Sequence, residues 1–148
     1  MSYYQTIYNR IRQAGYSEAA ALGFLGNWDC ESNCEPARLQ GDFSSYRTAS
    51  LLYVSRLSSG VMSREVFGND QKGFGLAQWT HYARKLALYD FWKRDGRAID
   101  DVTLQTDFAL YELKTDLKGL AAEIRDSKDV YSCADLICRK YECPAAAL

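Results

Sequence analysis

Apolar residues recur every three to four positions through most of the chain, which is the spacing of one face of an α-helix. The pattern predicts a first helix over residues 3–14, with Ile7 and Ile11 on one face. A second helix is expected to begin at the capping residue Ser17 and to end at Pro36, because proline cannot continue a helix. The chain therefore starts with two helices joined by a short turn.

The same periodicity predicts further helices after residue 44, and strand-like alternation is almost absent. In the first of them Leu51, Leu52 and Val54 are expected to face the core, and Thr80 is expected to cap a later one. Residues 68–75 are glycine-rich and polar, which indicates a loop or a small irregular hairpin. The sequence thus predicts an all-α fold of six to eight helices; the further ones cover 45–57, 64–69, 80–94, 102–114, 120–124 and 130–141.

Composition narrows the class of protein. A chain of 148 residues, with 47% apolar and 25% charged residues, predicts one globular domain over 1–148, either whole or the catalytic part of a longer chain. The net charge of −1 provides no attraction to nucleic acid or to an anionic membrane, and every apolar run is interrupted too early to span a bilayer. The polar N-terminus does not resemble a secretory signal, so synthesis in a cytoplasm is expected, and we expect a monomer.

Five cysteines form two clusters along the chain. Their odd number and the missing signal favour reduced thiols, while a bridge between the clusters stays open. A zinc site is disfavoured because the CxxC spacing is absent, so no metal and no cofactor are expected. The cysteines are Cys30, Cys34, Cys133, Cys138 and Cys143.

A glutamate followed by serine, Glu31-Ser32, stands near the end of the second predicted helix, after the apolar run of residues 19–28. Apolar surroundings disfavour the charged carboxylate and raise its pKa. A carboxyl group that stays protonated near neutral pH is what a general acid requires. The alternative is a solvated glutamate at a helix C-terminus.

The segment GFGLAQWT, residues 73–80, is the second candidate for chemistry. Its two glycines permit unusual backbone angles and close approach of a ligand, and Gln78 offers both a donor and an acceptor. Trp79 and Tyr82 offer flat faces and a polar edge. The alternative is a turn that leads into a helix, with Trp79 in the core.

Together these motifs resemble those of goose-type lysozymes and lytic transglycosylases, and more closely those of the phage tail lysozyme family. That family carries a GNW-x-x-ES-x-x-x-P pattern, a QGDF-like loop and a GLAQW segment, which correspond here to residues 26–36, 40–43 and 75–79. The C-terminal half matches loosely, through Gln105, Glu112 and the YE-x-P ending at Tyr141, Glu142 and Pro144.

The resemblance implies a lysozyme-like fold with a substrate cleft that binds bacterial peptidoglycan strands. It implies cleavage of the β-1,4 bond between N-acetylmuramic acid and N-acetylglucosamine, with Glu31 as the catalytic acid. An inverting enzyme also needs a carboxylate that holds the attacking water. Asp70 is slightly favoured over Asp42 for this role, although each is equally well explained as a turn-forming aspartate. Substrate contacts are expected from Gln78, Ser32, Gly75, Trp79, Tyr82 and Tyr141.

Alternative functions stay open at this point. Simple hydrolysis is favoured because Ala77 replaces the methionine of the transglycosylase GLMQ motif and the later AYN motif is not evident. A lytic transglycosylase with the same acid, or a non-catalytic wall-binding or tail-structural module, are the alternatives. The lone histidine, His81, is expected on the surface. The resemblance also implies a phage or prophage protein that reaches the wall through a holin or with the virion.

Overall fold

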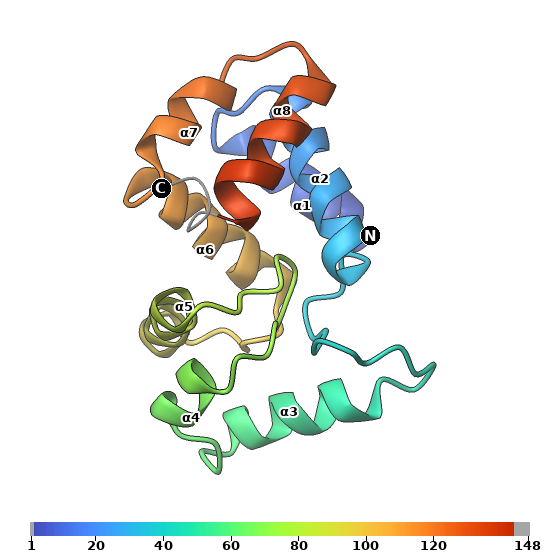
Figure 1. Ribbon diagram of the computed structural model, residues 1–148, viewed down its shortest axis with the longest axis vertical. Helices are drawn as coiled ribbons and strands as arrows, with labels where there is room; N and C mark the ends of the chain where they lie inside the picture. Colours follow the sequence, from blue (N-terminus) through green and yellow to red (C-terminus); the bar gives the residue numbers. More distant parts are fainter. Residues whose placement is uncertain (1, 144–148) are drawn as a thin grey trace.

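A computed structural model describes residues 2–143 and is all-helical over that range, as the sequence predicts (Figure 1). Within residues 2–143, eight α-helices and one short π-helix follow one another. They are α1 (Tyr3–Gln13), α2 (Glu18–Ser32), α3 (Thr48–Ser58), α4 (Arg64–Asn69), α5 (Tyr82–Asp95), α6 (Val102–Lys114), α7 (Lys118–Ile124), α8 (Val130–Ile137) and the π-helix η1 (Cys138–Glu142).

Helices α2 and α8 lie side by side and run in the same direction (Figure 1). Gly23 makes this possible, because a Cβ atom there would lie 3.0 Å from Ile137 and 3.1 Å from the backbone of Ala134. The Asn27 side chain donates to the Ala134 carbonyl at 3.0 Å, and the Trp28 ring lies against the buried Tyr141 ring. The end of α2 therefore meets η1, so two segments more than a hundred residues apart in the sequence share one end of the helix pair.

A second group of helices, α3, α4 and α5, is joined by an aromatic cluster. Tyr53 of α3 packs on Phe67 of α4 and on Phe74, with ring centroids 6.1 and 5.4 Å apart. The prediction that Leu51 and Leu52 face the core is wrong: both are about half exposed. The buried face of α3 instead carries Ser50, Tyr53 and Leu57, because the Ser50 hydroxyl is used inside the fold.

Two connections form the floor between the helix groups. Phe74 and Trp79 exchange backbone hydrogen bonds of 3.1 and 3.0 Å and close a small hairpin, which begins at the end of the region 68–75 predicted as a loop or hairpin and extends beyond it. The segment after α2 joins it through a bridge between Leu39 and Phe74, and the Gln40 N–H donates to the Gly73 carbonyl at 2.8 Å. The Gln78 side chain is thereby held beside the loop that follows α2.

Polar side chains cap several helices, and the cap predicted at Ser17 is confirmed. Ser17, Ser63 and Asp101 accept hydrogen bonds from the first turns of α2, α4 and α6. The prediction that Thr80 caps α5 is wrong, since the exposed His81 accepts from the Ala83 N–H instead. The last helix continues beyond Ile137 as the π-helix, and Pro144 lies outside the described residues. No helix within residues 2–143 is long and apolar enough to cross a membrane.

Candidate active site

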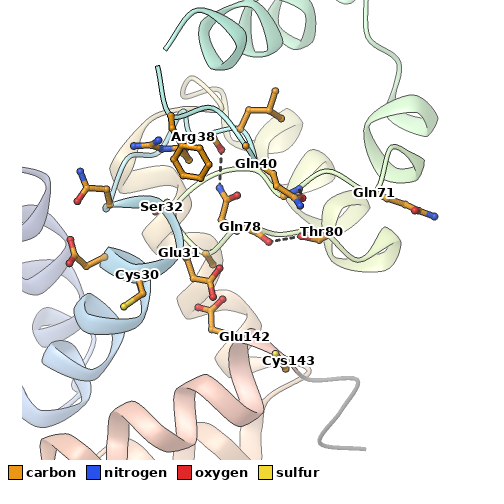
Figure 2. A pocket seen from close by; sticks show the side chains of 17 residues that line it. Cys30, Glu31, Ser32, Arg38, Gln40, Gln71, Gln78, Thr80, Glu142 and Cys143 are labelled. Atoms are coloured by element: carbon orange, nitrogen blue, oxygen red, sulfur yellow. Dashed lines mark hydrogen bonds between the residues drawn. The ribbon is translucent and has the colours of Figure 1, made fainter. Parts of the chain in front are cut away.

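An open cleft of about 570 Å³ lies where the end of α2, the segment 38–43, the hairpin region 71–80 and the end of η1 meet (Figure 2). This volume falls within the range of typical ligand pockets. Side chains of both charge types and one large aromatic ring line the cleft. The lining side chains that could bind a ligand or transfer a proton are Glu31, Arg38, Gln40, Phe43, Gln78 and Glu142.

Glu31 points from the last turn of α2 into this cleft (Figure 2). The residue is exposed, yet the cleft walls remove enough water from its carboxyl group to raise its pKa above the ordinary value. No ion pair or hydrogen bond to the Glu31 carboxyl occurs among the described residues, so desolvation is the cause of the shift. The expected rise in the Glu31 pKa is therefore confirmed in direction.

The backbone ends α2 immediately after the catalytic candidate. Asn33 and Cys34 both adopt left-handed angles, with φ of 57° and 54°, and their N–H groups bond to the carbonyls of Asp29 and Trp28. Asparagine tolerates this conformation better than most residues. Because α2 ends at Ser32, the Glu31 side chain lies on the last helical turn and lines the cleft.

Ser32 joins this helix end to the hairpin. Its buried hydroxyl lies 2.7 Å from the Leu76 carbonyl oxygen, with the Trp28 carbonyl at 3.0 Å as the other acceptor. Ser32 thus lines the cleft, but its hydroxyl bonds to the protein backbone beside Glu31.

Gln78 lies on the hairpin opposite Glu31 and is held rigidly. Its Nε2 atom donates to the carbonyls of Arg38 at 3.0 Å and Gly75 at 2.9 Å, and its own φ of 53° is left-handed. A Cβ atom at Gly73 would lie 2.8 Å from the Gln78 Oε1 atom, so only glycine leaves room there. Gln78 makes no hydrogen bond to Glu31 within residues 2–143, and its Oε1 atom accepts none from these residues.

Gly75 acts below the cleft and does not line it. Its φ is +83°, and a Cβ atom would lie 2.7 Å from the Oε1 atom of the buried Gln105. That Oε1 atom accepts from the Leu76 N–H at 2.9 Å, while the Gln105 amide donates to the carbonyls of Pro36 and Ile99. Gln105 therefore fastens the hairpin from beneath, and Gly75 provides the space.

Asp70 and Asp42, the two candidates for a water-holding carboxylate, are not among the residues that line the cleft. Asp70 accepts from the buried Lys85 ammonium at 2.5 Å and from the Tyr53 hydroxyl at 2.6 Å. Asp42 accepts from the backbone and hydroxyl of Ser50 at 2.8 and 2.7 Å, and from Ser44, which together hold its pKa well below the usual range. Both carboxylates are used to fix loops in this structure.

Three other predicted contact residues also lie outside the cleft lining. Trp79 and Tyr141 are buried and donate from Nε1 and the hydroxyl to the same Glu112 oxygen, at 3.1 and 2.7 Å. Arg84 closes this cluster with a two-pronged bond to Glu112. Tyr82 is partly exposed and donates to Glu65 at 3.0 Å. The structure therefore places Trp79 and Tyr141 in the core.

Sequence reasoning missed several cleft residues. Glu142 lies close to Glu31 (Figure 2), and Phe43, 88% exposed, also lines the cleft. Glu142 appeared only within the loose YE-x-P match. Its position depends on the packing of α8 along α2, which no local pattern reveals.

The cysteines do not form a disulfide in the structure, and Cys30 and Cys143 lie in the cleft wall. Over residues 2–143 no group of three or more His, Cys, Asp or Glu side chains is arranged to hold a metal ion. The thiol state stays a prediction.

The fold and the site define an all-α protein with a protonatable glutamate in an open, ligand-sized cleft. The chain belongs to the phage tail lysozyme family, whose model matches residues 2–147. Membership implies a lysozyme-like hydrolase of bacteriophage type that acts on the peptidoglycan of the cell wall. Neither the search of curated proteins nor the search of solved structures gave a match.

Proposed function

We propose that this protein is a muramidase that hydrolyses the β-1,4 bond between N-acetylmuramic acid and N-acetylglucosamine, with Glu31 as the general acid. The observation that carries the proposal is the position of Glu31: it projects into a cleft of glycan-binding size, and desolvation raises its pKa. A protonated carboxyl group there can give its proton to the glycosidic oxygen as the bond to the leaving sugar breaks.

The rest of the cleft suits a sugar chain. Gln78 offers its carbonyl oxygen to a substrate amide or hydroxyl, and Arg38 and Gln40 add donors along the same wall. Phe43 can stack on a sugar ring at the rim, where its face is almost fully exposed. Ser32 and Gly75 support this surface from behind through the hairpin.

The carboxylate that activates water is a separate question. Asp70, slightly favoured from the sequence, and Asp42 would each have to leave several hydrogen bonds to reach the cleft. The carboxylates that line the cleft beside Glu31 are Asp29 and Glu142. Comparison of the hydrolysis rates of folded Asp70→Asn and Asp42→Asn variants tests the original assignment, which requires the larger loss from Asp70→Asn.

Hydrolysis is favoured over transglycosylation because Ala77 in the cleft wall stands where transglycosylases have methionine. Mass spectrometry of muropeptides released from purified bacterial walls separates the alternatives. Reducing N-acetylmuramic acid ends support a muramidase, and 1,6-anhydro ends would show a transglycosylase. Absence of glycan products from several wall types would leave a non-catalytic module. Phage delivery through a holin or with the virion is part of the proposal.

A further inference from the structure

Two glutamates from opposite ends of the sequence meet in the cleft. Glu31 comes from the last turn of α2, and Glu142 from the end of η1, and their carboxyl groups point toward one another (Figure 2). The pairing follows from the side-by-side packing of α2 and α8. No hydrogen bond joins the two carboxyl groups among the described residues, so they interact through space and through the cleft contents.

Within residues 2–143 the Glu142 carboxyl group forms no direct ion pair. Its Oε1 atom and the Nε1 atom of the neighbouring Trp28 are buried and form no hydrogen bond of good geometry within residues 2–143, although the indole N–H lies near enough to favour the charged carboxylate. The cation that approaches from α5, Arg84, is bonded to both oxygens of Glu112 at 2.8 and 3.0 Å and to the Tyr141 carbonyl at 2.8 Å. An ionised carboxylate in this position is unfavourable, because burial penalises a charge that has no direct counter-ion.

The other charged groups around the two glutamates do not make an ionised Glu142 favourable. Desolvation comes first in raising the Glu142 pKa well above its ordinary value, followed by repulsion from Glu31. Arg84 and the Trp28 indole lower that pKa, and Glu112 raises it again. The cleft wall also contains Arg38, Asp29, Cys30 and Cys143. Besides Cys138 and Tyr141, η1 carries two cations, Arg139 and Lys140, which pair with Asp135 and Glu123 instead of with the two glutamates.

We propose that Glu31 and Glu142 form a coupled carboxyl pair that holds one proton at neutral pH, a shared proton that either member can carry, with Glu142 as the positioning residue that keeps Glu31 able to donate it. Two carboxylates close together in a desolvated site resist losing both protons, so the pair releases them in two separate steps. Glu31, the more open member, faces Gln78 and the glycan path, and Glu142 lies behind it. The role in catalysis rests on the proposed muramidase function, whereas the shared proton does not.

The proton balance of the reaction is simple. Glu31 gives the shared proton to the leaving glycosidic oxygen, the bond from the sugar C1 atom to that oxygen breaks, and the oxygen of one water molecule bonds to C1. The proton lost by that water replaces the one donated, so the pair returns to its single-proton state. The pair supplies no electrons and needs no further reactant.

The direct test is a pH titration of the glutamate side-chain carboxyl carbons by NMR in the intact protein. In the native chain we expect Glu31 and Glu142 to share an upper titration step above the ordinary glutamate value of about 4.3. In Glu142→Gln the Glu31 signal should show one step, at least about one pH unit below the shared upper step. In the reciprocal variant Glu31→Gln, the Glu142 step should also fall, which keeps the test valid should one variant fail to fold.

Asp135→Asn is the matched control, since it also removes one negative charge from the C-terminal helical segment, but at an exposed position paired with Arg139. It should leave both titrations unchanged. A Glu31 titration that is identical with and without Glu142 would overturn the pair. Coupled titration in a protein that releases no glycan fragments would contradict the muramidase function but support the carboxyl pair. Glycan release without coupled titration would support the muramidase function but contradict the pair.

Discussion

The Ser32 hydroxyl lies 2.7 Å from the carbonyl oxygen of Leu76, and this contact joins the turn that carries Glu31 to the hairpin that carries Gln78. Both residues are buried, so water does not compete for the contact. Together with the backbone bonds from residues 38–40 to the hairpin, the Ser32 side chain fixes the acid relative to the glutamine.

Removing that hydroxyl should affect activity more than stability. Ser32→Ala is expected to cost about 1 kcal/mol in the free energy of unfolding, the usual value of one hydrogen bond. Glycan hydrolysis should fall on the order of tenfold to a hundredfold, because small displacements of a catalytic group are costly. Urea denaturation and release of reducing ends measure the two effects. Ser58→Ala, at an exposed position of α3, is the control, and equal behaviour of both variants would exclude the positioning role.

Gly75 and Gly60 have the same φ of +83° but different surroundings. Alanine at either position would lower the free energy of unfolding by about 1–2 kcal/mol, because an L-residue disfavours the left-handed backbone conformation. Only at Gly75 would the new Cβ atom also press on Gln105, whereas nothing lies within 4 Å at Gly60. Gly75→Ala should thus lower the free energy of unfolding more than Gly60→Ala does, as thermal and urea melts can measure. Equal losses would show that the hairpin is not packed against Gln105.

Asp70 should matter for the fold. Lys85 is fully buried, and desolvation lowers its pKa. Without the Asp70 carboxylate, the buried Lys85 amine would either keep a charge that has no counter-ion or have to lose its proton, and both are unfavourable. Asp70→Asn is expected to cost about 3–5 kcal/mol in the free energy of unfolding. Asp90→Asn, which breaks an exposed pair with Arg64, should cost about 0–1 kcal/mol. A small loss at Asp70 would argue that its carboxylate is free for another role.

The raised pKa of Glu142 leads to a prediction of how the free energy of unfolding depends on pH. Its folded-state pKa is raised, so the native protein binds more protons than the unfolded chain once the pH exceeds about 4.3. The free energy of unfolding should therefore decrease as the pH rises from that point through the raised pKa, at about 1.4 kcal/mol for each unit of pKa difference. Glu142→Gln should lack this decrease, so its stability relative to the native chain should grow between pH 4.5 and pH 8 in urea titrations. A constant difference would contradict a protonated Glu142.

Helix periodicity was sufficient to predict the all-α fold and most helix ends, but it did not identify the buried face of α3. Residues 51–54 of that helix are all apolar or aromatic, so spacing alone leaves several faces equally apolar. The choice is made by Ser50, whose hydroxyl donates to Asp42 at 2.7 Å and accepts from the Leu39 N–H at 2.9 Å. A buried serine that bonds a loop cannot be inferred from hydrophobicity.

The site was predictable where its residues are neighbours in sequence. Glu31, Ser32 and Gln78 belong to short motifs, and the structure brings all three to one cleft. Trp79 and Tyr141 were expected at the sugar, yet their polar atoms are needed to satisfy the buried Glu112. Glu142 was missed as a site residue because its meeting with Glu31 depends on long-range packing. The catalytic roles of Asp70 and Asp42 stay predictions.

The most direct test of the central claim is the rate at which Glu31→Gln releases reducing ends from peptidoglycan, beside the native chain and Glu123→Gln. Glu123 is an exposed surface residue paired with Lys140, and its variant should keep full activity. We predict that Glu31→Gln keeps its fold by circular dichroism and loses at least about a hundredfold in rate, as expected for removal of a general acid. Retention of most of the activity by folded Glu31→Gln would contradict the assignment of the acid.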